Sequence, residues 1–396
     1  MGLMKLNLER SKAAPLHLRF NSYSFDPFWF CELITPHIQN IQTLRLDEFI
    51  TVEDLAQALP NFPQSTPNLR FLELAHKDGE PRWNPSIDPF ESFPDTLRAL
   101  TLYDIPLYPS VLKLTTLTEL NVHYYHIRPT QDTLLRFLEE NRSLESVHLR
   151  IDFDKFPARV SQRQAGITNR IQYLSITFWN PVIAQTLISS IPLQRGAHLE
   201  ITYRDEGTEL GLSAILSNTS ITHLPNLLSP TFIEYRSSPR VIRLVGPNGR
   251  FSYNRDWSPR IPFTEFLVLP LTDVRELFLI HSDLSMVFLP SPFPTLETLA
   301  IECNDASCLS SLFFPNHSAF PSLKTLEFSG CVITEEFMEE LAQFAVNRKA
   351  STLTWLHRVV IVDQHGEFPT AASISKLEEH VPIVDVRFDT MFRRSV

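Results

Sequence analysis

The motif Leu-x-x-Leu-x-Leu, which returns along most of the chain, constrains the fold more than any other feature. Its fourth position falls at residues 44, 72, 100, 120, 147 and 174, and again at 277, 299 and 326. Nine clear copies occupy 41–46, 69–74, 97–102, 117–122, 144–149, 171–176, 274–279, 296–301 and 323–328, with weaker copies at 196–201 and 220–226. Most intervals lie within the about 20–29 residues of a leucine-rich repeat.

Helical patterns lie between several copies of the motif. They span 51–60, 129–141 and 333–349. In the third, Thr334 is placed to cap the helix, Glu335 and Glu336 fall in the first turn, and Arg348 and Lys349 fall in the last. One apolar face carries Phe337, Leu341, Phe344 and Ala345. Each repeat is therefore predicted to be a short strand, a turn and usually a helix.

One strand and one helix cannot bury their apolar faces alone, but stacked copies can share a core. The sequence predicts an α/β leucine-rich-repeat solenoid, or horseshoe, with a parallel sheet on its concave face and helices on its convex face. We predict one domain over 1–396, with a cap region at 1–40, repeats at 41–226 and 271–330, and a helix-strand cap at 331–396. Residues 227–270 break the pattern, and 241–254 read as a β-hairpin around Asn248-Gly249. A first strand is expected at 15–20 and a last helix and strand at 375–389.

Cys331 follows the repeat at 323–328, where the repeat consensus has Asn or Cys. At that bend the backbone loses its ladder partners, and a small buried side chain can replace them. Asn304 holds the same place one repeat earlier. We interpret Cys331 as structural; a reactive thiol would need an exposed, electropositive setting.

The composition narrows the possible functions. The net charge of −10 and pI of about 5.7 disfavour nucleic acid as the main partner. With 10 glycines the chain shows no phosphate-binding loop, and its 30 prolines favour short, rigidly separated elements. The sequence shows no signal peptide and no apolar run long enough for a bilayer. We expect an intracellular protein, cytoplasmic or nuclear, that is monomeric and has no membrane association.

Three groups of residues suggest chemistry but fit it poorly. Asp152-Phe153-Asp154 has a metal-binding pattern, yet it follows a strand where solvated carboxylates are common. Cys303, Cys308, His317 and Cys331 lack the paired spacing of a zinc site. His123 and His126 could form a ligand pair, but ordinary surface positions are favoured. We predict no catalytic residues, no metal and no cofactor, and hence no enzyme activity.

Residues that flank the second leucine of each motif should point away from the core, onto the concave face. One column holds Arg45, Glu73, Thr101, Asn121, His148 and Ser175; the next holds Asp47, Ala75, Tyr103, His123, Arg150 and Thr177; a third begins with Phe71, Ala99 and Tyr173. Five of these belong to residue types that carry interface energy: Tyr103, His123, His148, Arg150 and Tyr173. We hypothesise that this group, called the cluster below, binds a protein partner; the alternative is an ordinary solvated surface.

Several phrases carry a resemblance to a known family. "LNLERSKAAPLHLRF" (6–20), "SSPRVIRLVGPNGRFSYN" (237–254), "PLTDVRELFL" (270–279), "LETLAIECND" (296–305) and "LAQFAVNRKASTLTWLHRVVIVDQHGEFP" (341–369) resemble the layout of the F-box/leucine-rich-repeat-like proteins of mushroom-forming fungi. In that family the F-box binds the Skp adaptor of a cullin ubiquitin ligase, and the repeats are presumed to select substrates. The resemblance implies a substrate-recognition protein.

The chain departs from the family at the F-box. That module would precede Leu8, and its Leu-Pro-x-Glu-type phrase is missing, so no adaptor-binding residue carries over. We expect either a truncated member or a paralogue without a ligase link, with a Skp-type adaptor as partner only if an F-box is missing from the gene model. The alternative function is a free-standing leucine-rich-repeat binding or inhibitor protein. A hydrolase or transferase would instead need a convergent polar pocket.

Overall fold

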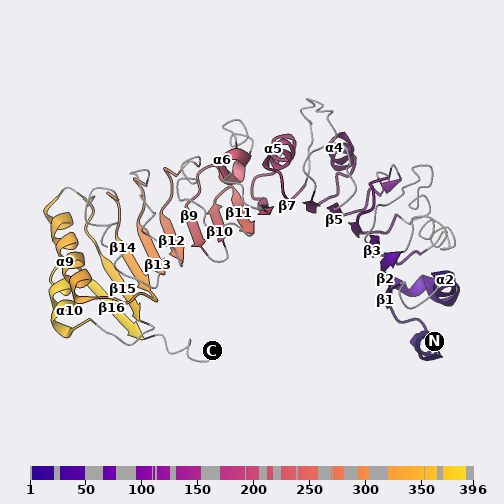
Figure 1. Ribbon diagram of the computed structural model, residues 1–396, viewed down its shortest axis with the longest axis horizontal. Coiled ribbons are helices and arrows are strands. Elements are labelled where there is room, and N and C mark those ends of the chain that lie inside the picture. Colours follow the sequence, from indigo (N-terminus) through magenta and orange to yellow (C-terminus); the bar gives the residue numbers. More distant parts are fainter. Residues whose placement is uncertain are drawn as a thin grey trace. The chain divides into compact units, whose positions relative to one another are not determined.

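The structure is a computed structural model that covers the chain in two compact units, Met1–Gln194 and Arg195–Val396 (Figure 1). The residues that it describes are 2–21, 27–49, 66–76, 95–108, 110–111, 114–124, 131–152, 170–191, 193–204, 212–216, 224–237, 240–256, 269, 271–280, 293–302, 320–351, 353–363 and 369–388. Each unit is a mixed α/β structure built on a mostly parallel sheet.

In the first unit the strands stand side by side in chain order, and each pair is parallel. They are β1 (Leu16–Asn21), β2 (Ile41–Phe49), β3 (Phe71–His76), β4 (Ala99–Tyr103), β5 (Glu119–Tyr124), β6 (Ser146–Ile151) and β7 (Tyr173–Phe178). The six clear copies of the motif in this unit each enter a strand, and β1 confirms the strand expected at 15–20.

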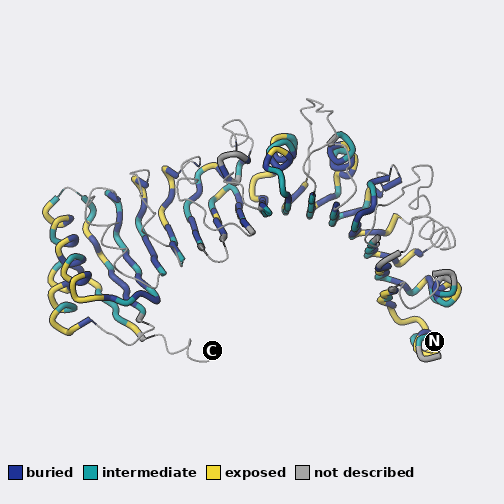
Figure 2. The backbone as a smooth tube through the Cα atoms, viewed as in Figure 1, coloured by how far each residue is buried: buried dark blue, intermediate teal, exposed yellow. Residues whose placement is uncertain are grey.

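The motif also sets the register. The fourth positions, Leu44, Leu72, Leu100, Leu120, Val147 and Leu174, pair with one another from strand to strand. All six are buried, and Figure 2 shows the buried segments recurring along successive strands. Because side chains alternate across a strand, the residues between the leucines share the opposite side, called the open face below.

The helices of the first unit are α1 (Gly2–Ser11), α2 (Pro27–Ile34), α4 (Gln131–Glu140) and α5 (Pro181–Ser190), with a 3-10 helix η1 (Thr35–Asn40). In Figure 1, α4 and α5 lie on the side of the strands away from the open face. Asn180 caps α5 by accepting a bond of 2.9 Å from the Val182 amide, next to Pro181 in the first turn. The helix predicted at 51–60 lies outside the described residues.

The second unit contains β8 (His198–Arg204), β9 (Phe232–Ser237), β10 (Arg240–Gly246), β11 (Gly249–Asp256), β12 (Glu276–Ile280), β13 (Thr298–Glu302), β14 (Thr325–Ser329), β15 (Arg358–Asp363) and β16 (Ile383–Phe388). Their spatial order is β8-β11-β10-β9-β12 and then chain order to β16. β10 is antiparallel to β9 and β11, whereas the other neighbouring strands described in this unit pair in parallel. In its described residues, the break predicted at 227–270 contains a three-stranded meander set into the sheet.

The predicted hairpin is β10–β11, but its turn lies one residue earlier than expected. Gly246 pairs with Gly249, so Pro247 and Asn248 make the turn. The ring of Pro247 holds its φ at about −65°. The two-residue turn that Asn-Gly favours needs a positive φ at both positions, so it cannot form here. Gly249, at φ 128°, takes the unusual conformation instead. A Cβ on residue 246 would lie 2.8 Å from the Ser229 carbonyl oxygen, which explains why this position is also a glycine.

The helices of the second unit are α6 (Leu212–Ile215), η3 (Pro225–Leu227), α9 (Glu335–Ala350) and α10 (Ala371–Glu378). α9 confirms the helix predicted at 333–349. The Thr334 hydroxyl accepts a hydrogen bond from the Phe337 amide, and the apolar face predicted for the helix is buried. α10 and β16 confirm the predicted last helix and strand. The weak motif copy at 220–226 does not form a strand in its described part, which enters η3.

A row of hydroxyl side chains links successive repeats. Thr96, Thr116, Ser143 and Thr295 each stand just before the first leucine of a motif, and each donates to a backbone carbonyl of the preceding repeat. The Thr116 hydroxyl lies 2.9 Å from the Leu97 oxygen, and the Ser143 hydroxyl 2.7 Å from the Leu117 oxygen. These bonds satisfy carbonyl groups at the bend before each strand. Within the described residues, no helix is long and apolar enough to cross a membrane.

Candidate functional site

Cys331 lies where its structural interpretation requires. It follows β14, is buried, and its Sγ lies 3.9 Å from the Ile301 oxygen and 3.5 Å from the Ser329 oxygen. One of these carbonyls belongs to the neighbouring β13, so the thiol joins the ends of two strands. A buried thiol between carbonyl oxygens lacks the electropositive setting of a nucleophile.

The strand register brings the cluster together on the open face of the first unit. Tyr103, His123 and Arg150 are direct neighbours across β4, β5 and β6. His148 lies two residues back from that row along β6, and Tyr173 lies four residues back along β7, where it pairs with Ser146. All five side chains are half-buried. The columns predicted from the sequence are confirmed from β3 to β7, whereas a register shift after Leu46 takes Asp47 out of line.

Ring contacts order the cluster. The rings of Tyr103 and His123 have centroids 4.5 Å apart, and those of His148 and Tyr173 lie 4.9 Å apart. The Ser146 hydroxyl lies 3.3 Å from a ring nitrogen of His148. Tilted ring pairs at these distances are favourable. The four rings thus form a preformed surface, which loses little conformational freedom when a partner binds.

Arg150 is held by Asp152, which follows β6. The guanidinium Nε lies 3.0 Å from one carboxylate oxygen of Asp152, and Trp179 Nε1 donates to the other at 2.9 Å. The carboxylate therefore fixes the orientation of the cation beside the rings. Asp152 thereby has a role in the protein itself. Its predicted companions in a metal motif, Phe153 and Asp154, lie outside the described residues.

Burial lowers the pKa of His123 from 6.5 to about 4, and the positive charge of Arg150 adds to this effect. Asp152 and Asp104 oppose it, and His148 reinforces it more weakly. His123 is therefore neutral at physiological pH. Its Nδ1 is buried and makes no hydrogen bond within the described part of the chain.

The predicted alternatives for metal chemistry remain predictions. Cys303, Cys308, His317 and His126 lie outside the described residues. Among the residues that the structure does describe, no three His, Cys, Asp or Glu side chains gather closely enough to hold a metal ion.

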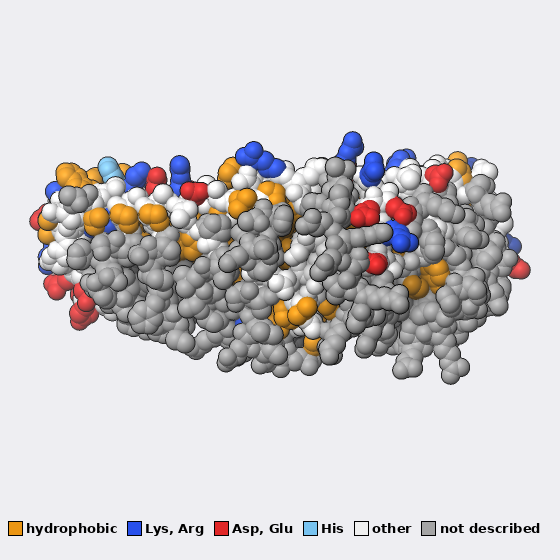
Figure 3. All heavy atoms as spheres, turned by 90° about the horizontal axis from the view of Figure 1, so that it is seen from above, with side chains coloured by type: hydrophobic (Ala, Val, Ile, Leu, Met, Phe, Trp, Pro, Cys, Tyr) orange, Lys and Arg blue, Asp and Glu red, His pale blue; other side chains and the backbone are white. Residues whose placement is uncertain are grey.

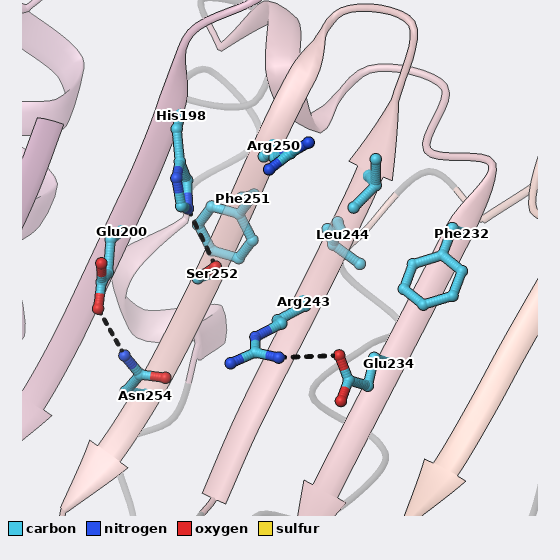
Figure 4. Close-up of a pocket in the computed structure, with 11 residues that line it drawn as sticks. His198, Glu200, Phe232, Glu234, Arg243, Leu244, Arg250, Phe251, Ser252 and Asn254 are labelled. Atoms are coloured by element: carbon cyan, nitrogen blue, oxygen red, sulfur yellow. Dashed lines mark hydrogen bonds and ion pairs between the residues drawn. The ribbon is translucent and has the colours of Figure 1, made fainter. Parts of the chain in front are cut away.

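A polar hollow of about 400 Å³ lies on the open face of the second unit (Figure 4). Its lining comes from β8, β9, β10 and β11, so the inserted meander creates most of it. The polar side chains of the lining are His198, Glu200, Glu234, Arg243, Arg250, Ser252 and Asn254. Its apolar lining includes Phe232 and Val245.

Hydrogen bonds and ion pairs fix most of this lining. His198 Nε2 lies 3.1 Å from the Ser252 hydroxyl, and Asn254 donates to Glu200 at 2.9 Å. Glu234 accepts from Arg243 at 3.1 Å and also pairs with Arg236. Burial lowers the pKa of His198; the nearby Glu200 opposes this, and Arg250 and Arg243 add to it. The His198 imidazole is thus neutral at physiological pH. The positive charges of Arg250 and Arg243 make the electrostatic potential of the site more positive.

Sequence reasoning missed this hollow. A signal was present: before the turn Arg243 lies between two apolar residues, and after it Arg250, Ser252 and Asn254 alternate with two aromatic residues. What the sequence does not reveal is that β11, and not β9, pairs with β8. That pairing brings His198 and Glu200 beside Arg250 and Ser252, across more than 50 residues of chain.

Figure 3 shows that, within each unit, described lysine and arginine side chains stand mostly along one edge of the face in that view. In the first unit, exposed arginines stand at or just before the start of several strands (Arg70, Arg98, Arg142 and Arg170). They are spread along an edge and do not converge on one point. This arrangement is typical of a solvated edge.

Comparisons with known proteins add little. No protein-family model and no curated protein matches the sequence. Among solved structures, the chain is similar to one titled "Crystal structure of Rad7 and Elc1 complex in yeast", at 14% sequence identity and a TM-score of 0.31, over 91% of this chain and 84% of the other. A similarity of that size carries no argument about function.

Proposed function

We propose that the chain is a leucine-rich-repeat solenoid that acts as a protein-interaction module, without catalysis of its own. The strand order within each unit supports this, because consecutive repeats lie side by side with their leucines in register. Such an arrangement leaves one side of the sheet free of helices in the described repeats, and that side offers extended contact area.

We infer that a protein partner docks on the cluster. The observation that carries this proposal is the grouping of four half-buried rings and one held guanidinium on adjacent strands. Tyrosine and arginine are enriched at interface hot spots, and rigid aromatic contacts add affinity at little entropic cost.

Alanine substitution tests the cluster. The partner is first captured from the source cells with the full chain and identified, and its affinity for purified variants is then measured. Tyr103→Ala and Arg150→Ala should each weaken binding at least about tenfold, the loss expected for hot-spot residues. Arg45→Ala is the matched control, because Arg45 is an open-face arginine of the same unit that pairs with Glu73 instead. Equal affinity for the Tyr103, Arg150 and Arg45 variants would refute the site.

We further propose that the bound partner is a substrate delivered to a ubiquitin ligase. The support is the resemblance of five long phrases to F-box/leucine-rich-repeat-like proteins. The test is to isolate the complete native gene product and to probe it for a Skp-type adaptor and a cullin. Recovery of the partner without either protein would instead favour a free-standing binding or inhibitor protein.

A further inference from the structure

The hollow on the second unit has a floor made by a small residue. On β11, Ser252 pairs with Glu200 of β8 on one side and with Arg243 of β10 on the other. Along its own strand, Arg250 and Asn254 share its face, two residues away in each direction. A serine ringed by four longer side chains leaves space above it, which accounts for the hollow (Figure 4).

One side of the hollow is cationic. Arg250 is exposed, and Arg243 keeps about half of its side chain exposed while it contacts Glu234. The two carboxylates of the lining already have partners: Glu200 accepts from Asn254, and Glu234 is shared by Arg243 and Arg236. Two guanidiniums, each with five N–H donors, border the hollow, while its two carboxylates already accept hydrogen bonds.

The other side of the hollow is apolar. Phe232 pairs across the sheet with Val245, and both are half-buried. The Phe232 ring also contacts the Phe278 ring of β12, with centroids 5.1 Å apart. Phe232 is thereby positioned as a wall on which an apolar side chain can pack.

We propose that this hollow binds an extended segment of a protein partner that presents an acidic side chain next to an apolar one. The carboxylate accepts hydrogen bonds from Arg250 and Arg243, and the apolar side chain packs on Phe232 and Val245. A side-chain carboxylate fits better than a chain terminus, because the strand amides that commonly hold a terminal carboxylate are used in the sheet. The site is separate from the cluster and can fail or succeed without it.

A synthetic probe tests the chemistry on the full chain. The probe is a fluorescein-labelled peptide Gly-Ser-Asp-Phe-Ser-Gly with an amidated end, and binding is followed by fluorescence anisotropy. We expect a dissociation constant in roughly the micromolar to millimolar range, as for other small contacts. Replacing Asp by Asn, or Phe by Ser, should each weaken binding about tenfold, and added salt should weaken it further. No saturable binding, or equal binding of all three peptides, would overturn the proposal.

Variants of the chain locate the binding. Arg250→Gln should weaken binding of the probe about tenfold, and Ser252→Leu should abolish it by filling the hollow. Arg275→Gln is the matched control, because Arg275 is an exposed arginine of the same unit outside the lining. Circular dichroism establishes that each variant is folded. Unchanged binding by both hollow variants would refute the site, as would tighter binding of a peptide that lacks Asp but ends in a free carboxylate.

A cross-check separates this site from the proposed function. Tyr103→Ala should leave probe binding unchanged, since Tyr103 belongs to the other unit. Loss of probe binding in that variant, with its fold intact, would place the peptide on the cluster and overturn the assignment to the hollow.

Discussion

Arg348 is a charged side chain that the fold buries completely. Its guanidinium donates to the carbonyl oxygens of Phe320 at 2.9 Å, Leu323 at 3.0 Å and Thr354 at 2.7 Å. Burial lowers its pKa to about 10, so it remains charged at neutral pH. It joins α9 to the loops that lead into β14 and β15.

Replacement of Arg348 should therefore be costly. Arg348→Met removes the guanidinium donors to the Phe320, Leu323 and Thr354 oxygens, and we expect the free energy of unfolding to fall by about 3 kcal/mol. Arg348→Lys should recover only part of this loss, because one ammonium cannot reproduce the planar fork. Urea denaturation measures both. Lys349→Met on the exposed side of α9 is the control, and an equal loss there would contradict the account.

His123 gives the first unit a dependence on pH. Its pKa falls from 6.5 to about 4 on folding, so the unfolded chain takes up the proton first. The contribution of the neutral His123 to the free energy of unfolding is therefore largest above about pH 6.5. It is lost as the pH falls towards 4, by up to about 3 kcal/mol for a shift of this size. Between pH 7 and pH 5, the urea midpoint should fall more for the native chain than for His123→Phe. Equal falls would mean that His123 does not titrate in this way.

Single residues were predictable where a repeat fixes their place. The columns of the open face follow from strand alternation, and the cap at Thr334 follows from residue type. Arg348 was predicted only as a favourable charge at the end of a helix. Its buried position depends on carbonyl groups of loops that the helix meets in three dimensions, and no local pattern encodes those.

At the scale of elements, the hydroxyl row before the motifs joins neighbouring repeats. Thr116→Val keeps the shape of the side chain but removes its bond to the Leu97 oxygen. We expect a loss of about 1 kcal/mol in the free energy of unfolding, together with faster hydrogen exchange at the start of β5. Thr118→Val is the control, because the Thr118 hydroxyl is exposed and bonds at 3.1 Å to a carbonyl that already accepts two amides. An equal effect of the two changes would assign the row no particular role.

Element pairing was predictable only where chain order and spatial order agree. The leucine spacing predicted β2 to β7 and β12 to β14, and the turn signal predicted the β10–β11 hairpin. β9 was missed, since its sequence lacks the motif. The pairing of β11 with β8 depends on which edge the meander presents, and so the hollow could not be predicted.

At the scale of the molecule, each strand packs mainly on its two neighbours. Leu72→Ala should remove about 3 kcal/mol of local stability, because this side chain is fully buried in β3. Because nearest-neighbour contacts dominate in such arrays, hydrogen exchange should rise in β2, β3 and β4 and much less in β6 and β7. A uniform rise across all strands of the unit would show that it unfolds as one block.

The meander β9–β10–β11 contains an odd number of strands, and this number decides the direction of the strands that follow it. Among the described strands of the second unit only β10 is reversed, so β9 and β11 run in the same direction, and both match the strands that flank them. A hairpin adds strands two at a time, so such a pair can be gained or removed without reversing any later coil. The insertion can therefore gain or lose a hairpin while every later strand keeps its direction in the sheet.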